Sequence, residues 1–238
     1  MDVGALRGSP VGQLVPISGT DGRTGLHYDA FAFLADPLPN TVDLASSTWT
    51  TVAQAEAALA RLDQAARQVP EPFLLRRPAL RREAQSTSAL EGTFAPFEEV
   101  LESDIEQRSE LSVEIREILN YVVAAEEGVD WIEERPLTGN LLASLQHTLV
   151  RGTPLGEFSD AGRLRDRQVF IGPKDAAIED ARFIPAPFGD QLRAGFEASI
   201  DWINSPPDAM PPVVRAALAH YVRRASFRAD RVVELLSR

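Results

Sequence analysis

The chain has 238 residues, of which 44% are hydrophobic and none is cysteine, so it can bury a core but cannot form disulfides or thiolate sites. Its formal net charge of -11 at pH 7 repels phosphate backbones and anionic lipid, so we expect neither nucleic acid nor a membrane surface as its main partner. It has no run of about 18 apolar residues and no signal peptide, which predicts a cytoplasmic protein.

The first 49 residues contain scattered Gly, Pro, Ser and Thr without a sustained helical period, which predicts an irregular arm wrapped on the rest of the chain. We expect Tyr28, Phe31 and Phe33 to anchor this arm. From Thr50 onward, apolar residues recur every three or four positions until Pro70, and this spacing predicts an amphipathic helix.

The next helix is predicted over 78–91, because a proline is tolerated in a first turn and Gly92 suits a C-terminal cap. Helical spacing also covers 95–103, 109–133, 139–151, 187–204 and 211–224. Two strand-like segments, 167–172 and 181–187, fit one small hairpin. The predicted fold is therefore mostly α with one small β-hairpin, and the turn near residue 92 divides it into parts 1–93 and 94–238.

Thr87 and Glu91 are four residues apart, which places them on one face of the last turn of the predicted 78–91 helix. A carboxylate there opposes the partial negative charge of the helix C-terminus by roughly 0.3–1 kcal/mol, so an arginine is the natural partner for Glu91. On spacing alone, a solvated glutamate before a capping glycine is the favoured interpretation, and the motif by itself is weak.

The segment around Glu91 reads REAQSTSALEGT and resembles the inhibitory helix of Fic-family proteins, in which Ser or Thr precedes three residues, Glu, and then Gly or Asn. The similarity extends in order over HYDAFAFLADPLP, LLASLQHTLVRG, AGRLRDRQVFIG, RFIPAPFGDQL and PPVVRAALAHY. The resemblance implies a Fic-like helical bundle in which Thr87, Glu91 and Gly92 form the inhibitory motif.

Members of this family transfer AMP from Mg·ATP to a Ser, Thr or Tyr hydroxyl of a target protein. The resemblance therefore implies ATP and Mg²⁺ as cofactors, a target protein as partner, and a homodimer. It also implies that Glu91 binds an active-site arginine and prevents productive binding of the ATP γ-phosphate. This role is physically sound, because an arginine held bidentately by a carboxylate cannot clamp a phosphate at the same time.

The family's catalytic loop, His-Pro-Phe-x-Asp/Glu-Gly-Asn-Gly-Arg, is missing from this sequence. The 211–224 region is followed by ASFRADRVVELLSR, which does not combine a base, a metal-binding carboxylate and a glycine-rich backbone. His220 precedes the loop position, His147 is expected in a structural helix, and His27 lies in the predicted arm. We therefore predict no catalytic residue and no metal site in this chain.

The predicted hairpin resembles the family's flap, whose edge receives an extended segment of the target protein by strand addition. On this resemblance, the docking residues are Gln168, Val169, Phe170, Ile171, Arg182, Phe183 and Ile184. A hairpin that only buries apolar side chains on the core is the structural alternative, and the two interpretations are compatible.

Two functions follow from these patterns. The first is a protein of the AMP-transferase family, of the autoinhibited type and inactive as this polypeptide because the catalytic loop is missing. The alternative is a non-catalytic Fic-like scaffold that binds partner proteins through the flap. An arginine-rich tail after residue 215 suggests nucleic-acid binding as a third function, but the overall charge opposes it.

Overall fold

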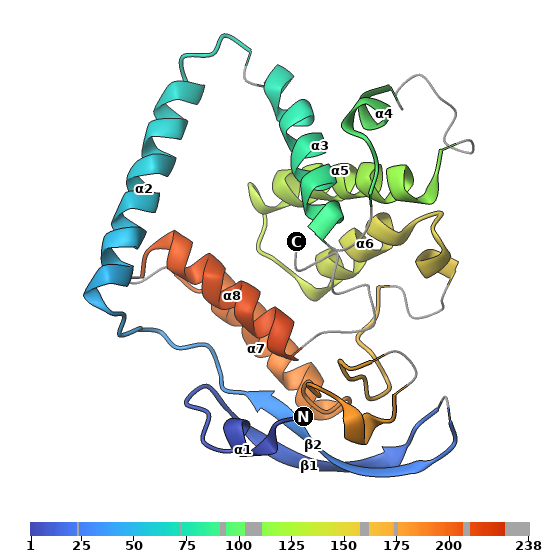
Figure 1. The fold of residues 1–238 in the computed structure, drawn as a ribbon. Coiled ribbons are helices and arrows are strands. Elements are labelled where there is room, and N and C mark those ends of the chain that lie inside the picture. Colours follow the sequence, from blue (N-terminus) through green and yellow to red (C-terminus); the bar gives the residue numbers. More distant parts are fainter. Residues whose placement is uncertain are drawn as a thin grey trace. The chain divides into compact units, whose positions relative to one another are not determined.

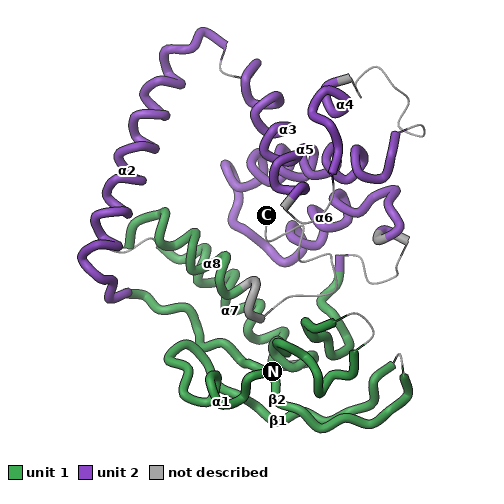
Figure 2. The backbone as a smooth tube through the Cα atoms, in the orientation of Figure 1, with its two compact units in different colours: residues 1–41, 163–237 green, residues 42–162, 238 purple. Residues whose placement is uncertain are grey.

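The computed structural model describes residues 1–22, 24–71, 73–90, 94–102, 111–157, 162–173, 176–206 and 210–226. The chain divides into two compact units, shown in Figure 2: unit 1 combines residues 1–41 with 163–237, and unit 2 contains residues 42–162. The predicted boundary between residues 93 and 94 falls inside unit 2, so that division stays a prediction. None of the described helices combines the length and the apolar character needed to cross a membrane.

The mostly α fold with one two-stranded hairpin is confirmed for the described residues, but the hairpin is not where the sequence predicted it (Figure 1). Strands β1 (Gly12–Thr20) and β2 (His27–Ala35) pair antiparallel within the segment that was predicted to be an irregular arm. Pro16 lies within β1, where a proline is tolerated because each strand of a two-stranded ribbon has an outer edge. The prediction of an irregular arm is therefore wrong for residues 12–20 and 27–35.

Segments 167–172 and 181–187 were predicted to be the hairpin, and the structure shows only an isolated antiparallel bridge between Ile171 and Phe183. Prolines explain the shortening, because Pro173 and Pro185 have no backbone N–H to donate to a ladder. The two segments still run side by side, so the predicted contact between them is present without regular strands.

Unit 1 also contains the helices α1 (Val3–Leu6), η2 (Ile178–Asp180), α7 (Asp190–Asn204) and α8 (Pro212–Ser226). Alternate residues of β2 are buried, and Tyr28 and Ala32 form a core with Ile178, Ala181 and Ile184. Helix α8 packs on β2 and on α7 (Figure 1). This unit thus joins the N-terminal hairpin to the segments that follow residue 163.

Trp202 of α7 is a structural anchor of unit 1. Its indole Nε1 donates to the Pro39 carbonyl at 3.1 Å, which fixes the segment that leaves β2. The Arg215 guanidinium lies 4.2 Å from the centre of its ring and donates to the Trp202 carbonyl at 2.7 Å. These contacts hold the end of α7 against α8 and satisfy carbonyls that a helix C-terminus leaves open.

Unit 2 contains α2 (Ser46–Ala66), α3 (Phe73–Leu90), α4 (Phe97–Glu102), α5 (Val113–Ile132), α6 (Gly139–Val150) and η1 (Pro154–Glu157). Helices α3 and α6 both pack on α5. The core lies between α3, α4 and α5, where Ile118 and Val100 are fully buried. Helices α5 and α6 begin at Ser112 and Thr138, whose side chains accept from backbone N–H groups of the first turn, as favourable N-caps do.

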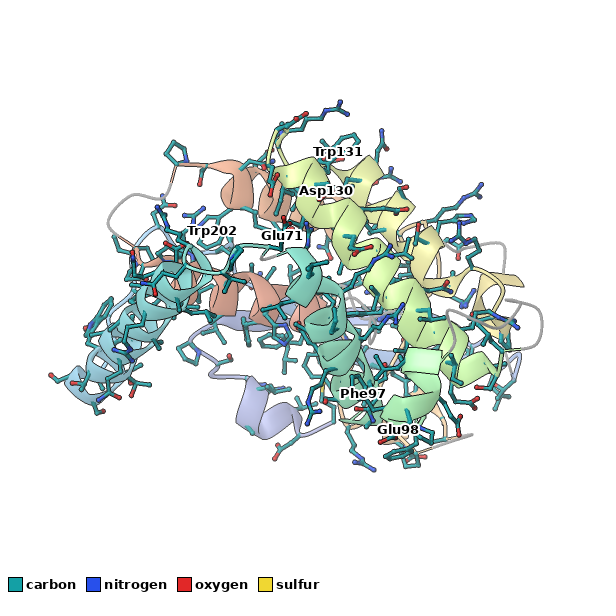
Figure 3. All side chains as sticks on the ribbon, turned by 90° about the horizontal axis from the view of Figure 1, so that it is seen from above. Glu71, Phe97, Glu98, Asp130, Trp131 and Trp202 are labelled. Atoms are coloured by element: carbon teal, nitrogen blue, oxygen red, sulfur yellow. The ribbon has the colours of Figure 1, made fainter. Side chains whose placement is uncertain are left out.

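Helix α3 begins at Phe73, five residues before the predicted start, so Pro78 lies inside the helix rather than in its first turn. Two ion pairs to α5 fix this added N-terminal part. Arg77 binds Glu126 with distances of 3.0 Å and 3.3 Å, and Arg76 binds Asp130 at 3.2 Å. Asp130 and Trp131 mark the α5 side of this contact in Figure 3. Tertiary packing thus overrides the preference of proline for a first turn.

Candidate functional site

The predicted docking residues form two extended segments of unit 1, which we call the outer arm (168–171) and the inner arm (182–184). Backbone hydrogen bonds join them around one residue pair. The Ile171 N–H donates to the Phe183 carbonyl at 2.8 Å, and the Arg182 and Phe183 N–H groups donate to the Ile171 carbonyl at 2.7 Å and 3.1 Å. The seven predicted docking residues are therefore brought together at one place.

Gln168 fastens the two arms to each other. Its side-chain Nε2 donates to the Val169 carbonyl at 3.1 Å and to the Pro185 carbonyl at 3.1 Å. Both partners are carbonyl oxygens, so only the amide nitrogen, and not the amide oxygen, can face them. Gln168 thus adds one side-chain hydrogen bond from the outer arm to the residue that follows the inner arm.

Arg165 supports the same place from below the outer arm. The residue is buried, and its guanidinium donates to the Ala186 carbonyl and, at 3.2 Å, to the Arg167 carbonyl. These are charge-assisted hydrogen bonds inside the protein, which are stronger than neutral ones. Arg165 therefore joins the beginning of the outer arm to the end of the inner arm.

The inner arm has a structured neighbour on each of its two sides. On one side it contacts Ile171 of the outer arm, and on the other the Phe33 N–H of β2 donates to the Ile184 carbonyl at 2.8 Å. The rings of Phe33 and Phe183 also contact, with their centres 5.8 Å apart. Of the two arms, the outer arm therefore has one side that neither the inner arm nor β2 contacts.

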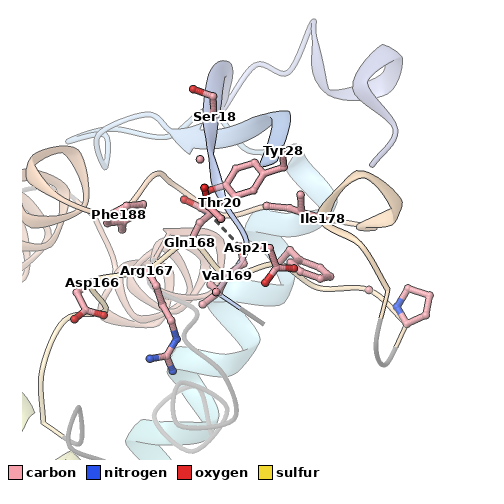
Figure 4. Close-up of a pocket in the computed structure, with 15 residues that line it drawn as sticks. Ser18, Thr20, Asp21, Tyr28, Asp166, Arg167, Gln168, Val169, Ile178 and Phe188 are labelled. Carbon is pink, nitrogen blue, oxygen red and sulfur yellow. Dashed lines mark hydrogen bonds between the residues drawn. The ribbon is translucent and has the colours of Figure 1, made fainter. Parts of the chain in front are cut away.

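A cavity of about 770 Å³ lies between the end of the β1–β2 hairpin and the outer arm (Figure 4). Its walls are residues 18–22, Tyr28, residues 166–170, residues 172–173, Ile178 and Phe188, all from unit 1. The charged side chains among these residues are Asp21, Asp166 and Arg167. The cavity thus places polar and aromatic groups directly beside a predicted docking edge.

Tyr28 is the most buried polar side chain of this cavity, with 6% of the residue exposed. Burial raises the pKa of its hydroxyl, and the negative charge of Asp21 raises this pKa further. The ring crosses over Gly19, its partner on β1, where an added Cβ would lie 2.7 Å from the Tyr28 Oη. Glycine at position 19 therefore gives the tyrosine hydroxyl its path to the cavity.

The predicted inhibitory motif lies at the other unit's α3. Thr87 is half-buried in the last turn of the helix, and the neighbouring Ser88 is 1% exposed. Glu91 and Gly92 lie outside the described residues, directly after the last helical residue Leu90. The predicted position of the motif at the end of a helix is consistent with these bounds, and the role of its glutamate stays a prediction.

The sequence predicted that the two arms lie side by side but did not predict the other residues of this cavity. His27 lies on β2 with its Nε2 3.5 Å from the Asp29 carboxylate, and both side chains are exposed. Asp21, Tyr28 and Asp166 were not predicted as site residues, because their grouping depends on the β1–β2 pairing. The available sequence signal was the run HYDAFAFLA, in which Tyr28, Ala30 and Ala32 occupy alternate positions and would share one face of a strand.

Comparison with known proteins gives a family match and similar solved structures. Residues 49–130 match the model described as Fic/DOC family N-terminal. The fold is similar to the crystal structure of a Fic family protein from Desulfovibrio desulfuricans G20, with a TM-score of 0.60 and 20% sequence identity. This likeness covers 84% of this chain and 58% of that chain. No curated protein matches the sequence.

Proposed function

We propose that this chain docks target proteins and regulates their AMPylation. In this reaction the AMP group of ATP is transferred to a Ser, Thr or Tyr hydroxyl of the target. Residues 49–130 match the Fic/DOC N-terminal model, and the fold is similar to that of a Fic family protein. The observation that supports the proposal most strongly is the pair of arms at 168–184, which are fastened by Gln168 and leave the outer arm at an edge.

Docking proceeds by strand addition to the outer arm. An extended peptide that lies along residues 168–171 would exchange backbone hydrogen bonds with them, which gives affinity with little demand on the peptide's sequence. The inner arm is a poorer edge, because Ile171 and Phe33 already hydrogen-bond to it from its two sides. Of the seven residues predicted to dock the target, those of the outer arm therefore contact it directly, and those of the inner arm support them.

Regulation resides in the end of helix α3. Ser88 and Ala84 are buried on the side of α3 that faces the core of unit 2, so the last turn is held in a fixed orientation. Glu91 follows this turn directly, and Thr87 precedes it by four residues. In our proposal Glu91 binds the arginine that would otherwise clamp the ATP γ-phosphate, so that the helix end restrains the transfer.

The loop that forms the ATP·Mg²⁺ site in the family has no counterpart in this sequence. The sequence has no His-Pro-Phe-x-Asp/Glu-Gly-Asn-Gly-Arg segment, and within the described residues no three His, Asp or Glu side chains gather as metal ligands do. The transfer step is therefore assigned to none of these 238 residues. Binding of ATP and Mg²⁺, expected from the family, has no residue in this chain to which we assign it.

The second candidate function is that of a non-catalytic scaffold, which binds partners through the outer arm without any transfer. The same arms favour it, because Gln168 and Arg165 organise them independently of any nucleotide. The two functions differ in whether Glu91 has an arginine and a nucleotide to regulate. A homodimer, predicted from the family, is compatible with both.

A labelling experiment tests whether these residues carry the transfer step and whether Glu91 restrains it. The protein and its Glu91→Gly variant are incubated with Mg²⁺ and ATP labelled on the α-phosphate, with and without cell extract, and label on protein is measured. We expect no label from either protein. Label that increases in the Glu91→Gly variant would show that these residues do contain a nucleotide site, and would contradict our assignment of the transfer step while supporting the regulatory role of Glu91.

A further inference from the structure

We propose that the cavity beside the outer arm is a specificity pocket for a basic side chain, arginine or lysine, of the docked target peptide. The proposal rests on the proposed docking function of the outer arm, and it adds which residue of the target is recognised. It is drawn from the shape, burial and charge of the cavity, all of which lie within unit 1.

The Tyr28 hydroxyl is the first observation. Tyr28 is 94% buried, since 6% of the residue is exposed, and its hydroxyl reaches the cavity over Gly19. Among the described residues, no hydrogen bond involves this hydroxyl. The hydroxyl oxygen itself is not fully buried, because it opens to the cavity. A hydroxyl that faces a cavity without a protein partner is therefore a group for a ligand to bind.

Charge decides which kind of ligand fits. Asp21 lines the cavity and lies close enough to Tyr28 for its charge to raise the pKa of the Tyr28 hydroxyl, so a carboxylate is present at this end of the cavity. Asp166 adds a second carboxylate to the walls, and Arg167 adds one cation. In Figure 4 the Arg167 guanidinium points away from Tyr28 and Asp21. A guanidinium or ammonium group at the Tyr28 end would donate to the Asp21 carboxylate, which accepts from several donors at once, and to Tyr28 Oη.

The apolar walls suit the stem of such a side chain. Val169 and Ile178 are buried beneath the cavity, and Phe188 is an exposed aromatic ring at its margin. Arginine and lysine bury their methylene groups along apolar surface while the charged end reaches polar partners. The volume of about 770 Å³ is in the range of ligand sites in proteins and exceeds the needs of one side chain, so neighbouring parts of the peptide have room as well.

The position of the cavity fits the proposed docking geometry. Residues 168–170 of the outer arm are walls of the cavity and also the edge at which strand addition is proposed. Side chains of an extended peptide alternate between two faces, so every second one would point toward the cavity. The chain's net charge of -11 also favours approach of a basic segment over an acidic one.

The test uses short blocked peptides of alternating valine and threonine with one variable central residue, and measures their dissociation constants with the whole protein. The central residue is arginine, citrulline as its neutral near-isostere, or glutamate. We expect the arginine peptide to bind about tenfold more tightly than the citrulline peptide, as one hydrogen-bonded charge would give, and the glutamate peptide to bind most weakly. The preference should shrink in Tyr28→Phe and in Asp21→Asn.

Asp29→Asn is the matched control, because Asp29 follows Tyr28 on β2, points to the opposite face and has 79% of its side chain exposed. This variant should retain the full preference for arginine. Arginine and citrulline peptides that bind equally to the wild-type protein would overturn the pocket while leaving docking intact.

Binding of an isolated arginine side chain distinguishes the pocket proposal from the docking proposal. N-acetyl-arginine N-methylamide has no length of strand to add to the outer arm, and its binding is followed by the NMR signals of the Tyr28 ring. Shifts that saturate, and that are lost with the citrulline analogue, support the pocket even if no peptide docks. No shift at millimolar concentration, together with tight binding of all peptides, would overturn the pocket alone.

Discussion

Replacing Gln168 by leucine should separate the two arms while leaving the fold of unit 1 in place. The change removes two N–H···O=C bonds of 3.1 Å each, to Val169 and to Pro185. Each such bond contributes about 0.5–1.5 kcal/mol net, and a buried carbonyl left without a donor costs more. Pro185 is fully buried, so we expect the arms to be destabilised by about 2 kcal/mol, a factor of roughly 30 in their local opening.

Native-state hydrogen exchange measures this opening at the Ile171 and Phe183 amides, whose hydrogen bonds join the arms. The matched variant is Gln168→Glu, which has the same length but no N–H to donate. At neutral pH its carboxylate would face two carbonyl oxygens, so this variant should be less stable than Gln168→Leu. Protonation favours the folded arms, so the difference should shrink as the pH falls. Unchanged exchange at both amides in both variants would refute the bridging role of Gln168.

Three further measurements check the roles of particular side chains. Asn120→Leu removes two buried donations, at 3.1 Å and 2.8 Å, to carbonyls at the end of α6, and should lower the free energy of unfolding by about 2–3 kcal/mol in urea titrations. Gly19→Ala forces a Cβ to 2.7 Å from the Tyr28 hydroxyl and should lower the thermal midpoint, whereas Tyr28→Phe should not. Burial raises the pKa of both Tyr28 and Tyr221. In an absorbance titration, both hydroxyls should therefore ionise at a higher pH than free tyrosine. Because these tyrosines lose their protons at lower pH in the unfolded chain than in the folded protein, the free energy of unfolding should fall as the pH rises above the ordinary tyrosine pKa.

The helices were predictable because their apolar residues repeat with the helical period. Helix α2 ends at Ala66 before Pro70, and α8 covers nearly the predicted residues. Helix α3 was predicted too short, since nothing in the local sequence shows that Arg76 and Arg77 bind carboxylates on α5. A single sequence contains the propensity of each segment but not the tertiary partners that extend it.

The β structure and the cavity were predictable only in part. The predicted segments 167–172 and 181–187 do lie side by side, but Gln168 and Arg165 hold them through side-chain hydrogen bonds instead of a ladder. The N-terminal hairpin was missed because proline and glycine in β1 are typical of loops. With the hairpin missed, Tyr28 could be named only as an anchor, and its position over Gly19 depends on the register between strands.

The central claim is that a target segment docks along the outer arm. An NMR titration of the labelled protein with an extended peptide that binds tests it most directly, through the backbone amides of both arms and of Phe33. We predict that the signals of residues 168–171 shift and that their amides become protected from exchange. The inner arm and Phe33 should keep the hydrogen bonds that they already have. Shifts confined to unit 2, or loss of the bond between Phe33 and Ile184 on binding, would contradict the account.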